Sequence, residues 1–540
     1  MGGPGNLYGI PSSGIISNTR QEIALAQDAT VHCGSKTVSW TKVADAIALL
    51  EKVGRGGTIN RILKKLPETN HVPEYIGNIS SMPAYRLVQN TTGLFRGKGE
   101  PKTWRYTLEE LVSFLAAFNA TRLHDTIYAI LGLASDVKPV HVSKSKSKVT
   151  NGESEQGPAE PGQGSAELGQ GIRRTNTHAD WSLTLVEHFE VDYKKPVLAV
   201  FKEFLNHAIT KSNSLDIICR PWAPDSGLDA KGNEETIRLP SWIPNLLRKP
   251  FRMTQNGNMV RYNPNPLVGP AIFRHKLYSA SGSHDMYYEI DLGDPCSERM
   301  IVKGFVLDKI GEIWDSGKFG NVPADWLKAG LWEDDNKVPP DELWRTLVAD
   351  RNAEGDDPDR WYPLVFQSAV KERGISYGFE TYRLIHENTS ATVAELFRRV
   401  QAVVWNRRLI RTEGQFMPWL TKGLRKSPGP LGLAPNDARK GDLVCIIFGC
   451  SVPLVLRPIP LPKQPASPQP DASETRSKEQ GANSLDASPP LVVPSPDDES
   501  EDAEKLYTLI GECYIDHMMD GEAIAYFRDK ELGSRKFILK

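Results

Sequence analysis

The residues best suited to nucleophilic chemistry in this sequence are a histidine and a cysteine that stand side by side, His32 and Cys33. A thiol becomes a strong nucleophile when a neighbouring imidazole takes its proton. However, these residues lie in a run, 29–33, that predicts a β-strand, and adjacent strand residues point to opposite faces. They therefore cannot act as a dyad with each other, and we expect Cys33 to be a buried structural cysteine.

Carboxylates near the end of the chain could do acid–base chemistry. Glu512 and Glu522 flank His517, and paired carboxylates can exchange protons with a substrate. We expect both glutamates to be solvated at the end of a strand, because a catalytic site needs a nucleophile, a base and an orienting group together. Asp442 follows Gly441, which is typical of a turn whose carboxylate accepts bonds from nearby backbone amides. We therefore predict no catalytic residue.

Cofactor, metal and nucleic-acid sites are not predicted either. The six cysteines are scattered, with no close pair at metal-ligand spacing. The glycine-rich runs do not stand between a strand and a helix, where a phosphate-binding loop would need them. Basic residues gather at 144–148 and at Arg407, Arg408 and Arg411, without a nucleic-acid-binding module around them. Arg407 and Arg408 follow a predicted helix, where positive charge offsets the helix dipole.

The tryptophans allow two interpretations. Aromatic side chains bury the largest areas, so most of these residues are expected to anchor a core or a domain interface. The alternative is an exposed recognition surface, because interaction hot spots favour tryptophan. The residues concerned are Trp222, Trp242, Trp326, Trp332 and Trp344.

Composition indicates an ordinary globular protein. The chain has 540 residues, of which 39% are hydrophobic and 24% charged, and its formal net charge is -2. Such a charge gives no global field that would hold nucleic acid or an anionic membrane. No apolar run approaches the length of about 18 residues that spans a bilayer, so we predict no membrane span. Scattered cysteines and the lack of a signal peptide favour a reduced, cytoplasmic protein.

Residues 121–136 connect the helical first part of the chain with its second body. A charged opening with Arg122, His124 and Asp125 leads into apolar positions at helical spacing. Gly132 is predicted to end this helix, because glycine adopts a left-handed backbone easily. We expect a packing helix in which Arg122 and Asp125 form a buried or half-buried ion pair. The apolar positions are Leu123, Ile127, Ile130 and Leu131.

The remaining pattern predicts an α+β fold. Thr107 with Glu110, and Thr392 with Glu395, are capping boxes that begin helices. Several short strands in the last quarter favour a small β-barrel-like module. Helices are expected through 43–50, 108–115, 197–208, 341–348 and 392–405; strands at 29–33, 215–218, 408–412, 443–448, 454–459 and 507–515; an extended segment at 239–243; and a hairpin within 300–314.

Segment 138–178 contains almost no aromatic or branched apolar residues, and segment 460–503 is rich in proline, serine and acidic residues. Such segments cannot bury enough surface to offset chain entropy, so both are predicted to be disordered inserts. The chain is accordingly divided into an N-terminal part at 1–53, a helical region at 54–137, the first insert, a mixed α/β region at 179–406, and a barrel-like module at 407–540 that contains the second insert.

Several segments together resemble the fungal heterokaryon-incompatibility (HET) domain proteins. Residues 20–40 are similar to the end of a HET domain, so 1–53 is interpreted as a truncated remnant of it. Further similar segments occur in family order at 122–134, 191–193, 239–244, 408–412, 431–435, 441–442, 453–457 and 510–523. The matching residues, for which we expect structural roles, are Arg122, Asp125, Tyr128, Gly132, Trp242, Gly432, Gly441, Asp442, Gly511, Glu512, Gly521 and Glu522.

The resemblance implies a role in fungal non-self recognition after cell fusion, leading to growth arrest or cell death. Two N-terminal family motifs, an aromatic Ser-Tyr-x-Trp-Gly strand end and a Trp-Ile-Asp-x-x-Cys-Ile-Asn-Gln segment, are missing here. We therefore expect a non-enzymatic protein that acts through protein contacts. Two alternatives stay open: a TIR-like, nucleotide-cleaving effector, if the missing N-terminal region exists, and a purely structural scaffold.

Overall fold

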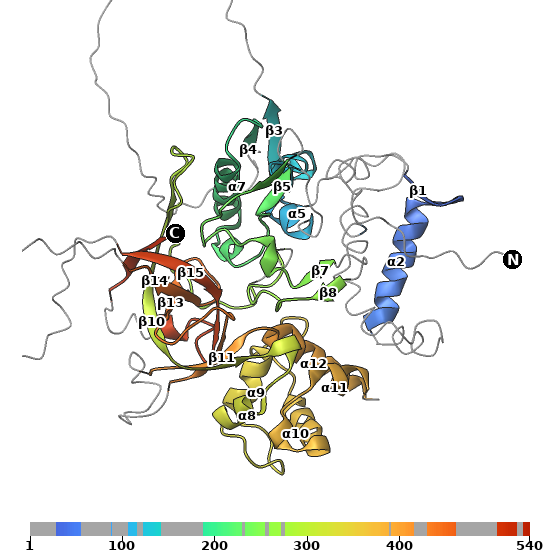
Figure 1. Ribbon diagram of the computed structural model, residues 1–540, viewed down its shortest axis with the longest axis vertical. Coiled ribbons are helices and arrows are strands. Elements are labelled where there is room, and N and C mark those ends of the chain that lie inside the picture. The colour runs from blue at the N-terminus through green and yellow to red at the C-terminus, as the bar shows by residue number, and fades with distance from the viewer. Residues whose placement is uncertain are drawn as a thin grey trace, which may run out of the picture.

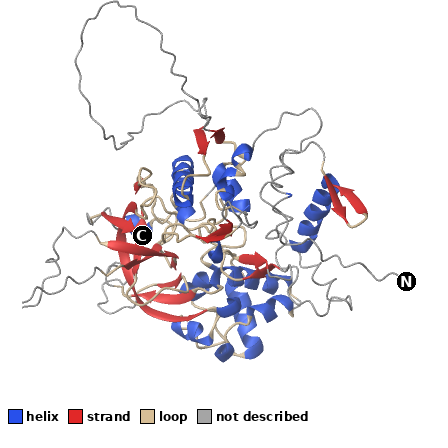
Figure 2. Ribbon diagram, turned by 45° about the horizontal axis from the view of Figure 1, so that its top comes forward, coloured by secondary structure: helices blue, strands red, loops and turns tan. Residues whose placement is uncertain are grey.

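The computed structural model contains both helices and sheets, which confirms the α+β class (Figures 1 and 2). It describes residues 29–55, 88, 106–115, 122–141, 187–228, 233–253, 259–271, 276–387, 390–414, 429–460, 505–525 and 533–540. Among the described residues, no helix combines the length and the apolar character that a membrane crossing requires.

The first described unit is a strand hairpin followed by a helix. β1 (Thr30–Cys33) pairs antiparallel with β2 (Lys36–Ser39), and α2 (Trp40–Arg55) begins at the next residue. The predicted strand at 29–33 and the helix through 43–50 are thus confirmed. His32 is exposed, whereas the side chain of Cys33 lies outside the described part, so its predicted burial stays a prediction.

A helical layer comes next, and its capping is local. The backbone N–H of Thr107 donates to Glu110 Oε2 at 2.7 Å, and the N–H of Glu110 donates to Thr107 Oγ1 at 3.3 Å, as the capping box predicts. The predicted buried face at 197–208 is also confirmed, because Val197, Phe201 and Phe204 are buried. The elements are α5 (Leu108–Leu115), α6 (Asp125–Tyr128), β3 (Val137–His141), β4 (Glu187–Val191) and α7 (Val197–Ser212).

The connecting segment at 121–136 differs from its prediction in two respects. Only α6 is α-helical, and Gly132 lies inside the 3₁₀ turn Leu131–Leu133 instead of ending a helix. Asp125 accepts a bond from the Tyr193 hydroxyl at 2.6 Å, while the exposed Arg122 lies over the Tyr193 ring at 5.8 Å. Tyr193 thus stands between the two charges that were predicted to pair. The predicted apolar face is buried.

The start of the first insert and the strand predicted at 215–218 also differ from the prediction. The first insert was predicted from residue 138, but β3 extends to His141 and pairs in parallel with β4, which begins at Glu187. Residues 142–178 lie outside the described part of the chain, as do 461–503. The strand predicted at 215–218 is wrong, because Asp216–Ile218 forms a 3₁₀ turn.

The main sheet has nine strands within the described residues, and one of them, β10, is 17 residues long. The hairpin predicted within 300–314 is therefore wrong. Gly304 lies within this strand and pairs with both Arg535 and Ile447. A Cβ at Gly304 would lie 2.1 Å from the Ile446 carbonyl oxygen, so the glycine permits close strand approach.

Because Gly304 has a partner on each side, β17 and β13 lie on opposite edges of β10. Hydrogen bonding then runs from β13 to β14, β15 and β17 and returns to β10. The second half of β10 continues instead into β11, β12 and β16. The strands are β9 (Tyr288–Ile290), β10 (Met300–Ser316), β11 (Arg408–Thr412), β12 (Leu431–Ala434), β13 (Leu443–Ile447), β14 (Leu454–Pro458), β15 (Leu506–Glu512), β16 (Tyr514–Ile515) and β17 (Arg535–Leu539).

A second helical layer comes after β10 and lies at the lower end of the molecule in Figure 1. Phe366, Phe379 and Phe397 pack against one another in tilted and edge-to-face arrangements, with ring centroids 5.1–5.6 Å apart. The side chain of Ser390, not the predicted Thr392, caps the last helix by accepting the Val393 N–H at 3.4 Å. The helices are α8 (Ala324–Ala329), α9 (Asp341–Val348), α10 (Tyr362–Arg373), α11 (Thr381–His386) and α12 (Ala391–Val404).

Short elements join the layers. The main hydrophobic cluster draws its buried residues from all layers, the first in the sequence being Tyr106 and the last Leu539. All five of the tryptophans considered above are buried in it, which confirms that they are core residues. The short elements are the paired strands β5 (Ser226–Leu228) and β6 (Glu234–Thr236), the paired strands β7 (Phe251–Met253) and β8 (Met259–Arg261), and the 3₁₀ turn Leu246–Arg248.

Replacing Gly304 by alanine tests the close packing of β10. The added methyl group has no space beside the Ile446 carbonyl, so Gly304→Ala is expected to lower the unfolding free energy by about 2 kcal/mol or more in urea titration. Gly533→Ala is the control, because no atom lies within 4 Å of a Cβ placed there, and it is expected to stay within about 0.5 kcal/mol. Equal effects of the two substitutions would contradict the close strand approach.

Candidate functional site

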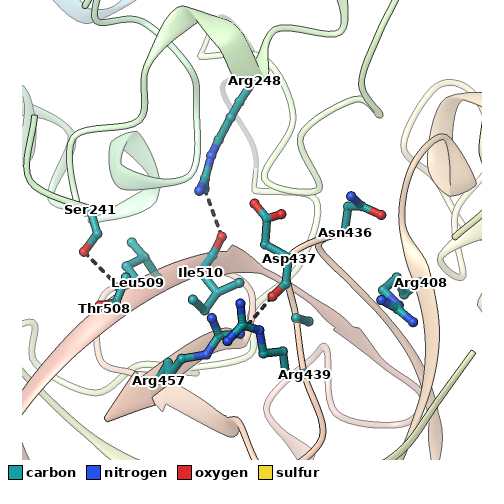
Figure 3. A pocket seen from close by; sticks show the side chains of 11 residues that line it. Ser241, Arg248, Arg408, Asn436, Asp437, Arg439, Arg457, Thr508, Leu509 and Ile510 are labelled. Carbon is teal, nitrogen blue, oxygen red and sulfur yellow. Dashed lines mark hydrogen bonds between the residues drawn. The ribbon is translucent and has the colours of Figure 1, made fainter. Parts of the chain in front are cut away.

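A cavity of about 470 Å³ opens between the segment 241–248 and the main sheet (Figure 3). Its wall is unusually rich in arginine for a chain with almost no net charge. The strands β11, β14 and β15 and the loop after β12 contribute the other sides. The lining residues are Ser241, Arg248, Arg408, Asn436, Asp437, Ala438, Arg439, Arg457, Thr508, Leu509 and Ile510.

The first wall is anchored by a serine and a tryptophan. The predicted extended segment contains a turn, because the Ile243 N–H donates to the Pro240 carbonyl at 3.0 Å. This turn buries Trp242, whose Nε1 donates to the Glu298 carbonyl at 2.9 Å. The Ser241 hydroxyl accepts the Leu509 N–H at 2.9 Å, so the wall is fastened directly to β15.

Arg248 leaves the same wall and reaches across the cavity to β15. Its Nη1 donates to the Ile510 carbonyl at 2.9 Å. The next residue, Gly511, has φ +146°, and a Cβ there would lie 3.0 Å from Pro435 Cγ and 3.5 Å from Arg248 Nη1. Glycine thus avoids backbone strain and also leaves space for the arginine.

The opposite wall contains an ion pair between a buried carboxylate and a half-buried arginine. Gly441 forms the predicted turn with φ +87°, and Asp442 accepts the Arg439 N–H at 2.8 Å. Arg457 donates to both carboxylate oxygens of Asp442 at 2.8 Å, and these hydrogen bonds raise the pKa of Arg457 above its ordinary value. The prediction of a turn is confirmed, while the arginine partner was not foreseen.

The other two arginines that are discussed in this wall, Arg408 and Arg439, form fewer hydrogen bonds with their side chains. Arg408 donates from Nε to the Trp314 carbonyl at 2.9 Å. Among the described residues, the exposed Arg439 guanidinium has no hydrogen-bond or ion-pair partner. Of the described residues that line the cavity, only Asp437 carries a carboxylate. The cavity therefore has a surplus of positive charge.

Behind this wall, Glu512 forms a buried ion pair. Arg407 Nη2 lies 2.7 Å from Glu512 Oε1, and the N–H groups of Leu267 and Val268 donate to the same carboxylate at 2.7 and 3.3 Å. The prediction that Glu512 is solvated is wrong, and burial raises its pKa above the ordinary value. Arg407 also donates to the Val403 carbonyl at 2.7 Å, which agrees with its predicted place at a helix end.

The loop 265–269 is held from several directions. The Asn265 N–H donates to the Ala402 carbonyl of α12 at 2.8 Å. Arg220 donates to the Gly269 carbonyl at 2.9 Å and to Glu109 of α5 at 2.7 Å. Since Glu512 holds two amides of the same loop, both helical layers and the sheet meet there.

The segment after β16 contains a carboxyl group that sequence reasoning missed. Asp516 is buried, and burial raises its pKa from 3.8 to about 6. Its carboxylate accepts the Tyr514 hydroxyl at 3.0 Å and lies 3.4 Å from Nε2 of His517. Glu522 instead accepts the Asp520 N–H at 2.8 Å, whereas Glu512 is bonded to Arg407, so the two glutamates bind different groups and do not act as a pair.

The structure brings some of the family-motif residues together and leaves others apart. Trp242, Asp442 and Gly511 support the cavity wall, and Glu512 stands behind it. Gly432 permits close pairing of β12 with β16, because a Cβ there would lie 2.4 Å from the Tyr514 carbonyl. The residues that do not contribute to this wall are Arg122, Asp125, Tyr128 and Gly132 around α6, and Gly521 and Glu522 after β16.

Comparisons with protein-family models, with curated proteins and with solved structures gave no match. Within the described part of the chain, no group of histidine, cysteine and acidic residues could hold a metal ion. The candidate site is accordingly defined by geometry and charge: a polar cavity with four arginines in its wall.

The raised pKa of Asp516 predicts a pH-dependent stability. The folded protein holds this proton up to about pH 6, whereas an ordinary aspartate loses it near 3.8, so stability falls as the pH rises through this interval. The unfolding free energy of the wild type is expected to drop by about 2 kcal/mol more than that of Asp516→Asn between about pH 4 and about pH 7.

Urea titration at the two pH values measures this difference. Asp325→Asn is the matched control, because the Asp325 side chain is 76% exposed and its loss is expected to leave the wild-type pH dependence unchanged. If the Asp516 variant follows the same pH dependence as the wild type, the carboxyl group does not carry the shifted pKa.

Proposed function

We propose that this chain is a non-enzymatic protein of the heterokaryon-incompatibility type, which acts in the cytoplasm through protein contacts in fungal non-self recognition. One observation carries the proposal: several of the segments that resemble the family, although far apart in the sequence, supply residues to the same cavity. Ser241, Arg408, Arg457 and Ile510 come from four of these segments and line it together.

One more of these segments supports the cavity without lining it, because Asp442 holds Arg457 in place. Glu512, which lies in the same segment as Ile510, is the last residue of β15 and bonds to Arg407 behind the cavity. Short motifs in separate parts of a chain are explained most simply when they build one site. This convergence supports the family resemblance as well as the importance of the cavity.

The chemistry of the wall favours binding over reaction. The Ser241 hydroxyl donates to the Lys540 carbonyl oxygen and accepts the Leu509 N–H. Both hydrogen bonds hold this side chain in place as a structural link. Apart from the Asp437 carboxylate, the charged groups of the wall are guanidinium ions, which orient and neutralise anions and do not exchange protons at neutral pH. A recognition site requires groups of this kind.

The second helical layer supports a role in protein contacts. Phe319 and Leu331 are 72% and 78% exposed, and both have positive φ values, 57° and 60°. Tyr377 is 69% exposed. Strained residues persist where the surrounding structure holds them, and they concentrate at functional sites. Large exposed apolar side chains of this kind are suited to a protein partner.

The proposal includes the architecture of the C-terminal module. Hydrogen bonding around β10, β13, β14, β15 and β17 returns to its first strand, which supports a small β-barrel-like module. In this arrangement the module presents the ends of β14 and β15 to the segment 241–248, and the cavity forms between them.

Growth of a filamentous fungus that expresses the full chain tests the proposed function. The wild type is expected to arrest growth, whereas the double variant Arg248→Gln/Arg439→Gln is expected to grow like cells with an empty vector, because the cavity has lost two cations. Hyphal extension and protein level are measured together.

Lys440→Gln is the matched control, since it removes one positive charge beside Arg439 from a residue that does not line the cavity. It is expected to arrest growth like the wild type. Normal growth with the wild type would contradict the proposed function, as would equal arrest by the double variant at the same protein level.

A further inference from the structure

We propose that the arginine-lined cavity binds a phosphate monoester. This inference rests on the proposed function of the cavity as the recognition site, and it adds the chemical class of the group that is recognised. Charge, donor geometry and size each support it.

Two of the four lining arginines are available for an anion. Arg457 is paired with Asp442, and Arg408 Nη2 lies 3.9 Å from the Asp315 carboxylate. Among the described residues, Arg248 and Arg439 have no ion-pair partner. A phosphate monoester carries roughly −1.5 to −2 at neutral pH and could pair with both guanidinium groups, whereas a single carboxylate carries only one negative charge.

The donors approach the cavity from two sides. Figure 3 shows Arg248 reaching in from the segment 241–248, while Arg439 and Arg457 come from the opposite wall. Arg248 uses Nη1 for the Ile510 carbonyl, so its other N–H groups remain for a ligand. Guanidinium groups form paired hydrogen bonds with phosphate oxygens, which gives direction as well as attraction.

The wall is organised in advance for such a ligand. Asp442 fixes the Arg457 side chain through both carboxylate oxygens, and the Ile510 carbonyl fixes Arg248. Side chains that are already held lose less conformational entropy when they bind. Arg439 has no partner among the described residues, so it can close on the ligand from the open side.

The size indicates that the phosphate is part of a larger molecule. A volume of about 470 Å³ exceeds what a phosphate group alone would fill and lies within the usual range of ligand pockets. Asn436 and Thr508 add polar contacts in the wall. Both a phosphorylated side chain of a protein and a mononucleotide carry the required group.

Isothermal titration calorimetry of the full chain tests the inference. The probes are inorganic phosphate, adenosine monophosphate, a phosphoserine peptide and the same peptide with glutamate in place of phosphoserine. At least one phosphate-bearing probe is expected to bind with one-to-one stoichiometry. Arg439→Gln and Arg248→Gln are each expected to weaken it at least about tenfold, because a charge-assisted bond is lost. Lys440→Gln is expected to bind like the wild type.

Each result has a defined meaning. Preference for the phosphopeptide or for the mononucleotide identifies the source of the phosphate. No binding of any phosphate probe overturns the inference, and so does equal binding of the glutamate peptide or undiminished binding by the arginine variants. The proposed function is tested separately, because growth arrest without phosphate binding would reject only the ligand class, and phosphate binding without growth arrest would reject only the cellular role.

Discussion

The buried contact between Glu512 and Arg407 is the interaction on which the arrangement of the layers depends. A buried carboxylate is costly unless it is fully hydrogen-bonded, and here two backbone amides and a guanidinium satisfy it. Arg407 in turn bonds the end of α12, and the amides belong to the loop 265–269, which Arg220 links to α5. One carboxylate therefore connects the sheet to both helical layers.

The same strand end serves the cavity. Ile510 offers its carbonyl to Arg248, Gly511 leaves space for that arginine, and Glu512 fixes the strand from behind. The position of the arginine-lined wall thus depends on a residue that does not line it. A change at the end of β15 is therefore expected to alter both the stability of the protein and the geometry of the cavity wall.

Local signals in the sequence predicted the local structure well. The capping box at Thr107 and the strand at 408–412 needed only neighbouring residues, and both are present in the structure. Other predictions failed because a distant segment decides the outcome, although one local signal, the capping box at Thr392, was also wrong. The hairpin predicted within 300–314 is one long strand, because strands from two other parts of the chain pair with it on both sides. Glu512, which was expected to be solvated at a strand end, is buried against Arg407, which is over a hundred residues away in the sequence. The cavity itself combines several such distant pairings.

Hydrogen–deuterium exchange at residues 265–269, compared between the wild type and Glu512→Gln, tests the central role of Glu512 most directly. Slow exchange of the Leu267 and Val268 amides is expected in the wild type, and much faster exchange is expected in the variant, in which the carboxylate and the ion pair with Arg407 are lost. Faster exchange should extend to the segment 241–248. Unchanged protection in the variant would show that Glu512 does not hold the layers together.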